Sequence, residues 1–242
     1  MMDYAGRVAA ADTYPKLLRL NASEHGGEIA LREKDLGLWR VFTWNDYQTR
    51  VHDFALGMVE LGLGKGDVIG IIGDNRPDWV SAEIATHAIG AMSLGLYRDV
   101  LDEEAAYLLS YGEAKLVFAE DEEQVDKLLA LADRVPNLKH IVYSDSRGMR
   151  KYDDPRLMEA GKLAGMGRDR AAREPGLFDR LVDATSGEES ITCARTSAAI
   201  DSHSLGANST KVGAISRKSF IMVSGCSTKL TFIRHSRPLP SA

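Results

Sequence analysis

The segment Val68-Ile-Gly-Ile-Ile-Gly-Asp-Asn-Arg-Pro-Asp-Trp79 decides the expected fold of this 242-residue chain. Its first five residues are apolar throughout, which is typical of a strand whose two faces are both covered by helices. Pro77 indicates that a helix begins close by, around Asn75, because proline is tolerated in a first helical turn. A buried strand that turns through a polar corner into a helix predicts a βαβ unit and a parallel sheet.

The same alternation of strand and helix continues on both sides of this segment. Short runs rich in β-branched and aromatic residues predict further strands at 39–43, 92–96, 115–119 and 140–143. Apolar residues at helical spacing predict helices at 44–61, 75–88, 102–111, 122–132 and 174–183. Residues 156–173 have a weaker pattern, which fits either a poorly ordered helix or a linker. The expected fold class is therefore α/β, with a mostly parallel sheet flanked by helices.

A sharp change in composition divides the chain near residue 192. Residues 1–192 carry 23 lysines and arginines against 34 acidic residues, whereas residues 193–242 carry seven against one. Ten of the 18 serines and both cysteines lie in this second, basic segment. We expect residues 1–192 to be structured and residues 193–242 to be a disordered tail, since the tail has neither helical nor strand periodicity. Translation in a wrong reading frame after about Ala194, or a degenerate gene end, is the simplest explanation of the tail.

Several functional classes find no support in the sequence. The net charge of −5 gives no reason to expect nucleic-acid binding, and the cations of the tail lack interleaved aromatic residues. The N-terminal residues do not resemble a secretory signal, and no run approaches the ~18 apolar residues of a membrane span. Neither the two cysteines nor the six histidines have metal-binding spacing. We therefore expect a cytoplasmic protein without a metal site, either free or peripheral to a membrane.

The polar corner formed by Asp74, Asn75 and Arg76 is a candidate ligand site, because open α/β sheets bind ligands at the carboxyl ends of their strands. A simpler interpretation stays open, in which Asp74 and Asn75 cap the following helix and Arg76 pairs with a nearby acid. The glycine-rich stretch 62–66 is expected to be a plain helix-to-strand turn, since a phosphate loop follows a strand and does not precede it.

Short motifs spread over about 180 residues resemble the AMP-forming long-chain acyl-CoA synthetases, a family of adenylate-forming enzymes. They occur in the family's order and spacing, in the segments 14–18, 32–39, 42–44, 73–79, 96–99, 123–127, 152–157 and 174–178. None of these motifs is the family's catalytic signature. The resemblance implies that residues 1–192 are the first, incomplete part of the N-terminal AMP-binding domain.

The resemblance also implies an activity in two steps. A fatty-acid carboxylate attacks the α-phosphorus of ATP to give an acyl-adenylate, and coenzyme A then displaces AMP to form the thioester. In the family, Mg²⁺ and a loop rich in glycine, serine and threonine that ends in lysine neutralise the phosphates. Here only Thr196 and Ser197 match the start of that loop, while Ala198 replaces a glycine and no lysine occupies its end. We therefore expect no catalytic residues in this chain, and no ligase activity of the chain alone.

Two other functions stay open. One is a non-catalytic α/β module that binds a nucleotide or a partner at the corner 73–78. The other is a different adenylate-forming enzyme, such as an amino-acid-activating or luciferase-like one, although the segments 32–39 and 96–99 favour the long-chain ligases. An incomplete domain of a long-chain ligase or of another adenylate-forming enzyme would expose faces that are normally buried, so we also expect self-association.

Overall fold

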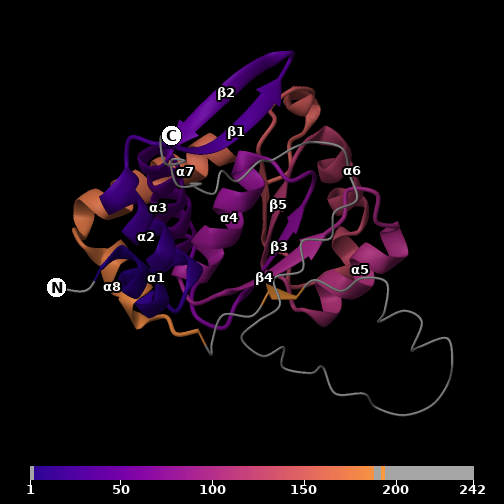
Figure 1. Ribbon diagram of the computed structural model, residues 1–242. Helices are drawn as coiled ribbons and strands as arrows, with labels where there is room; N and C mark the ends of the chain where they lie inside the picture. The colour runs from indigo at the N-terminus through magenta and orange to yellow at the C-terminus, as the bar shows by residue number, and fades with distance from the viewer. Residues whose placement is uncertain (1–2, 188–191, 194–242) are drawn as a thin grey trace, which may run out of the picture.

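The computed structural model describes residues 3–187 and 192–193, and Figure 1 labels many of the elements. The α-helices are α1 (Tyr4–Ala10), α2 (Tyr14–His25), α3 (Trp44–Glu60), α4 (Pro77–Ala88), α5 (Asp102–Tyr111), α6 (Glu122–Ala130), α7 (Ala160–Arg173) and α8 (Leu177–Ala184). The strands are β1 (Ile29–Asp35), β2 (Leu38–Thr43), β3 (Val68–Ile72), β4 (Met92–Leu96), β5 (Leu116–Ala119), β6 (His140–Tyr143), β7 (Leu157–Glu159) and β8 (Thr192–Cys193).

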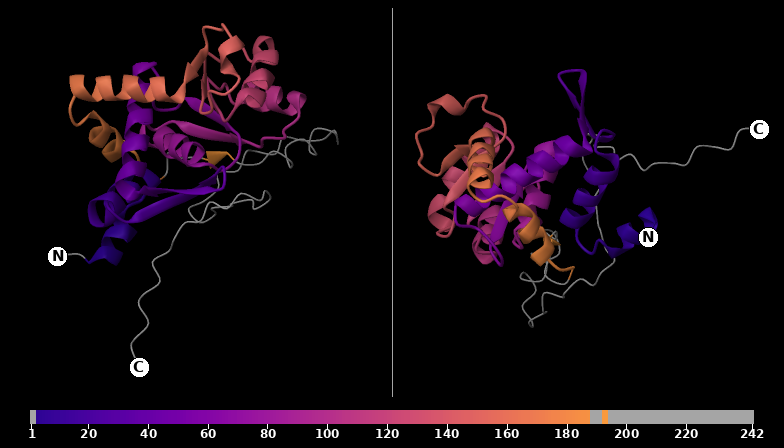
Figure 2. Two further views of the ribbon diagram at one scale, coloured as in Figure 1. Left: turned by 90° about the horizontal axis from the view of Figure 1, so that it is seen from above. Right: turned by 90° about the vertical axis from the view of Figure 1, so that its left-hand side faces the viewer.

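Six parallel strands form the central sheet, in the order β7-β6-β5-β3-β4-β8. Strands β1 and β2 form a separate antiparallel hairpin. Figures 1 and 2 show the central sheet between two layers of helices, with α3, α4 and α7 on one side and α5 and α6 on the other. The predicted α/β class, with a parallel sheet flanked by helices, is confirmed.

The two faces of the sheet bury alternate residues of the same strands. Leu116 and Phe118 of β5 pack in the core beneath α3 and α7, whereas Val117 and Ala119 pack in the core beneath α5 and α6. The rings of Phe118 and Phe54, on α3, lie with their centroids 5.4 Å apart. Because both faces are covered, β3 and β5 are continuous apolar runs without the alternation of a half-exposed strand.

Local signals place α3 where the sequence predicts it. The Thr43 hydroxyl accepts a hydrogen bond from the Asp46 amide, and the Asp46 carboxylate accepts one from the Thr43 amide. This capping box satisfies amide groups that have no partner within the helix. After the helix, the stretch 62–66 is the predicted turn into β3, with positive φ angles at its first and last glycines.

Residues 156–173 form strand β7 and helix α7, so the helix is the correct one of the two expected alternatives and the linker is wrong. Helix α7 packs on α3 through small residues. A Cβ atom on Gly167 would lie 1.9 Å from the backbone oxygen of Asp53, and one on Gly57 would lie 2.4 Å from the backbone oxygen of Leu163. A contact made by glycines leaves little of the apolar stripe from which a helix is predicted, which explains why the sequence pattern is weak here.

The sequence patterns also missed α1, α2 and β1, and they placed the start of α4 too early. Helix α4 begins at Pro77, with Arg76 as its N-cap residue and no side-chain hydrogen bond at the cap. Asp74 and Asn75 therefore do not cap this helix, contrary to one of the expected interpretations. Strand β1 has charged residues at four of its seven positions, so it shows no apolar run.

The predicted tail, residues 193–242, lies outside the described residues apart from Cys193 at the end of β8. Its expected disorder and the expected boundary at residue 192 stay predictions.

We predict that Gly167→Ala lowers the free energy of unfolding by at least about 2 kcal/mol, because the new methyl group would overlap backbone of α3 that cannot move freely. Gly165→Ala, on the same helix, is the matched control. A Cβ at position 165 would contact only the end of the Arg168 side chain, at 3.7 Å, so this variant should be up to about 1 kcal/mol more stable than the parent. Urea unfolding followed by circular dichroism measures both. Equal stability of the two variants would contradict the close α3–α7 contact.

Candidate functional site

The carboxyl ends of β3 and β5 form the topological switch point of the sheet. The chain passes from β3 to the neighbouring β4 on one side, and then returns to β5 on the other side of β3. In open α/β sheets this arrangement leaves a crevice outside the strand ends, where ligands bind. The predicted corner, residues 74–76, follows β3 and lies at this point, beside Glu120, which follows β5.

A close backbone approach joins the two strand ends. The amide of Asp74 donates a hydrogen bond of 2.6 Å to the Glu120 carboxylate. Gly73 has a φ of 145°, and a Cβ there would lie 2.6 Å from the Cβ of Glu120. Glycine is therefore required at position 73 by both conformation and space.

Arg76 pairs with acids from two different elements. Its Nε lies 2.7 Å from Oε1 of Glu33 on β1, and its Nη1 lies 3.3 Å from Oε1 of Glu120. Asp35 is 3.8 Å away from the third nitrogen, Nη2. Partial burial disfavours the charge of Arg76, but its bonds to Glu33 and Glu120 outweigh that effect and raise its pKa. The expectation that Arg76 pairs with a nearby acid is thus confirmed.

Arg98, in the loop after β4, forms the second centre of the same ionic network. Its guanidinium lies 3.1–3.4 Å from the carboxylates of Asp74, Asp121 and Glu123. Lys127 of α6 donates to the backbone oxygens of Arg98 and Val100, both at 2.9 Å, and holds this loop against the helix. Asn75 is exposed, and its side chain makes no hydrogen bond to another described residue.

The charge balance of this corner is unlike that of a phosphate site. Six carboxylates surround two guanidinium groups, from Glu33, Asp35, Asp74, Glu120, Asp121 and Glu123 around Arg76 and Arg98. A phosphate needs donors that are not already satisfied and a positive local field, and both arginines are engaged. In this geometry the corner is an ionic network that ties the hairpin and β4 to the switch point.

The second predicted site, Thr196 and Ser197, lies outside the described residues. Strand β8 pairs in parallel with β4, Ser93 opposite Thr192 and Leu94 opposite Cys193, so its carboxyl end lies at the same edge of the sheet as the ionic network. Among the described residues no group of three or more histidine, cysteine or carboxylate side chains could hold a metal ion. No helix of the described part is both long enough and apolar enough to cross a membrane.

A polar stripe on α4 was missed by the sequence interpretation. Trp79, Glu83 and His87 occupy positions i, i+4 and i+8, which places them on one side of the helix. His87 is buried, and its Nε2 lies 3.0 Å from the Ser93 hydroxyl of β4. The indole nitrogen of Trp79 is buried without a hydrogen-bond partner. The spacing of Trp79, Glu83 and His87, four residues apart along the helix, was the signal that could have revealed the stripe.

Burial shifts the ionisation of the two titratable members of this stripe. It raises the pKa of Glu83 to about 7 and lowers the pKa of His87 to about 4. The Glu83 charge also contributes to the raised pKa values of Tyr14 and Tyr47, after burial. His87 is thus neutral near pH 7, whereas Glu83 is about half protonated there.

The strand order, the helices on both faces and the corner at the switch point define a doubly wound α/β domain, a fold in which ligands bind at the switch point. The luciferase-like enzyme from the mealworm Zophobas morio has the same fold over 61% of this chain and 32% of its own, with a TM-score of 0.52 and 18% identity. The family model described as AMP-binding enzyme matches residues 18–176. The chain belongs to this family.

Its curated relatives include fatty-acid–CoA ligases. The long-chain-fatty-acid–CoA ligase ACSBG2 of Xenopus laevis is 27% identical over 158 residues, which are 65% of this chain and 21% of that protein. The long-chain-fatty-acid–CoA ligase heimdall of Drosophila melanogaster is 32% identical over 104 residues, or 43% of this chain and 15% of that protein. The chain thus spans about a fifth of the length of these relatives.

We predict that the Glu83 carboxyl makes the folded chain less stable as the pH rises. The unfolded chain loses this proton near pH 4.5, whereas the folded chain keeps it up to about pH 7. Stability is therefore lost between about pH 4.5 and 7, by up to about 3 kcal/mol. Glu83→Gln removes this titration, so the stability of the variant relative to the parent should increase by that amount across the window.

His87 has the opposite effect, because its lowered pKa makes the folded chain less stable as the pH falls below about 6.5. The comparison of Glu83→Gln with the parent cancels this effect, since both chains contain His87. Urea unfolding at a series of pH values measures the difference. Asp153→Asn, which removes an exposed carboxylate, is the control and should give a flat difference. A flat difference for Glu83→Gln as well would contradict the buried, neutral state of Glu83.

Proposed function

We propose that this chain is the N-terminal part of a long-chain fatty-acid–CoA ligase and is inactive alone. The family match over residues 18–176 is the observation that carries the proposal, and the names of the relatives supply the acyl substrate. The complete enzyme would take a long-chain fatty acid, ATP with Mg²⁺, and coenzyme A, in fatty-acid metabolism in the cytoplasm or at a membrane surface. We keep the proposed boundary at residue 192, with an out-of-family tail from 193 to 242.

The lack of activity follows from what the chain would need for adenylation. Charge develops on the phosphates when the carboxylate attacks, so unpaired donors or cations must face them. The stretch 196–204 starts like a phosphate loop at Thr196 and Ser197, but Ala198 stands at the glycine position and the stretch has no lysine. In the described part, Arg76 and Arg98 are both held by carboxylates.

A non-catalytic binding module is the second candidate, because the corner 73–78 lies at the switch point where such folds bind ligands. The excess of carboxylates there argues against a nucleotide phosphate as the ligand. Thermal unfolding with and without MgATP tests whether the corner binds a nucleotide. A nucleotide at a hundredfold its Kd would stabilise the chain by about 2.7 kcal/mol, whereas the ligase fragment should show no shift.

Self-association is part of the same proposal. Leu101 and Tyr97, near β4, are exposed large apolar side chains, and β4 is paired with β8 over only two positions. Such surfaces promote association when no further chain covers them. Sedimentation velocity over a range of concentrations would measure it.

We predict that the purified chain shows no ATP–pyrophosphate exchange with palmitate or oleate. A full-length long-chain-fatty-acid–CoA ligase, assayed in parallel, is the positive control. Exchange above the no-enzyme background and proportional to the amount of chain would overturn the proposal of inactivity. Sequencing the gene across codons 185–250 tests the origin of the tail, since a Thr-Ser-Gly-Thr-Thr reading in another frame would identify a frameshift.

A further inference from the structure

The β1–β2 hairpin projects from the body of the molecule and has an apolar tip (Figure 1). Leu36 is 87% exposed, Leu38 74%, Trp39 58% and Val41 54%, and no other six consecutive described residues contain as many exposed large apolar side chains. Single exposed apolar residues are ordinary, but a cluster of them at one projecting turn indicates a contact with something outside the chain.

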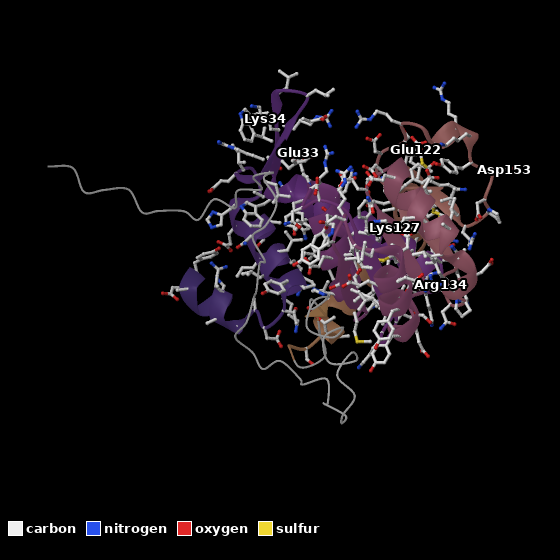
Figure 3. All side chains as sticks on the ribbon, turned by 90° about the vertical axis from the view of Figure 1, so that its right-hand side faces the viewer. Glu33, Lys34, Glu122, Lys127, Arg134 and Asp153 are labelled. Atoms are coloured by element: carbon white, nitrogen blue, oxygen red, sulfur yellow. The ribbon has the colours of Figure 1, made fainter. Side chains whose placement is uncertain are left out.

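The two faces of the hairpin carry different charges. On the inner face, Glu33 lies opposite Arg40 and Asp35 opposite Leu38, and both acids lie near Arg76. On the outer face, Arg32 lies opposite Val41 and Lys34 opposite Trp39. Figure 3 shows Lys34 on the outer side and Glu33 on the side toward the rest of the molecule.

The outer face combines basic and apolar side chains and has no acid. Arg32 and Lys34 are exposed and form no ion pair with another described residue. Each lies directly across the hairpin from an exposed apolar side chain, so that the charges flank the apolar surface. Long basic side chains can keep their charged ends in a polar layer while their stems lie along apolar material.

The turn itself contains an unusual residue. Leu36 and Gly37 have φ angles of 47° and 85°, so both central residues of this two-residue turn have positive φ. Such turns favour asparagine, aspartate or glycine at the first position, where a leucine is strained. Leu36 makes this turn less favourable and is also the most exposed of the large apolar side chains in the described part. A strained and highly exposed Leu36 indicates that this side chain contacts something outside the chain.

We propose that the tip and outer face of the β1–β2 hairpin bind an anionic lipid bilayer. Leu36 at the tip would enter the boundary between headgroups and acyl chains, Trp39 would lie at the headgroup level that tryptophan prefers, and Arg32 and Lys34 would contact lipid phosphates. A protein partner fits less well, because a stable protein interface buries roughly 800 Å² per partner, whereas the exposed apolar side chains here lie at four positions, 36, 38, 39 and 41. This binding deepens the proposed location at a membrane surface and does not depend on ligase activity.

Co-sedimentation of the full chain with phosphatidylcholine vesicles, with and without phosphatidylglycerol, tests the proposal in the absence of ATP and fatty acid. We expect binding to the anionic vesicles. Leu36→Asn and Trp39→Thr should each weaken it about tenfold, because each removes an apolar side chain from the lipid. Lys34→Glu should weaken it at least about fivefold, since each basic residue near the surface contributes about a factor of five.

The variants are chosen so that unfolding cannot imitate the result. Leu36→Asn places a favoured residue in the turn and should raise the unfolding midpoint while it lowers vesicle binding. Tyr111→Ser changes a tyrosine that is 69% exposed at the end of α5, and Lys139→Glu reverses an exposed charge just before β6. Both controls should bind like the parent.

Three results would overturn the proposal: no sedimentation of the parent chain with anionic vesicles, equal binding to neutral vesicles, or equal binding by Leu36→Asn and its parent. Gel filtration of the parent and Leu36→Asn provides a further test. A parent dimer that becomes a monomer in the variant would show that a second copy covers the tip, and would also overturn it.

Discussion

The edge of the central sheet at the carboxyl ends of its strands depends on the contacts of one side chain, the carboxylate of Glu120. It accepts the amide of Asp74 and pairs with Arg76, so it joins the end of β5 to the turn after β3. Arg76 also binds Glu33 on the β1–β2 hairpin, whose strands are not paired with those of the central sheet. Without this carboxylate the half-buried amide of Asp74 would lose its hydrogen-bond partner, and Arg76 would lose one of its counter-charges. Leaving a partly buried donor or charge unpaired destabilises the folded chain.

The fold could be predicted from the sequence where burial leaves a chemical pattern. β3 is a continuous apolar run because helices cover both of its faces, and α3 begins at Thr43 because side chains satisfy its first amides. The sequence left a helix and a linker open at α7, where Gly167 allows the backbones to approach and no large residue marks the contact. The prediction failed at β1, where Glu33 and Asp35 lie near Arg76 of the loop after β3, a partner that is distant in the sequence.

The candidate site could be predicted only in part, for a related reason. A polar corner after a buried strand is visible in the sequence, and so is the tendency of Arg76 to pair with an acid. The partners are not, because Glu33 is 43 residues and Glu120 44 residues away along the chain. The raised pKa of Glu83 could not be predicted for the same reason. The sequence shows only an acidic residue, whereas the packing of α2, α3 and α4 in the fold buries it and raises its pKa.

The ionic network and the hairpin are parts of one arrangement. Arg76 binds Glu33 and lies near Asp35, so the acidic side of β1 faces the body of the molecule and its charge is compensated there. Because side chains alternate along a strand, this contact forces Arg32 and Lys34 to the opposite side, together with Trp39. A corner that resembles a ligand site by its position in the sheet therefore sets the orientation of the hairpin, and makes its outer face basic.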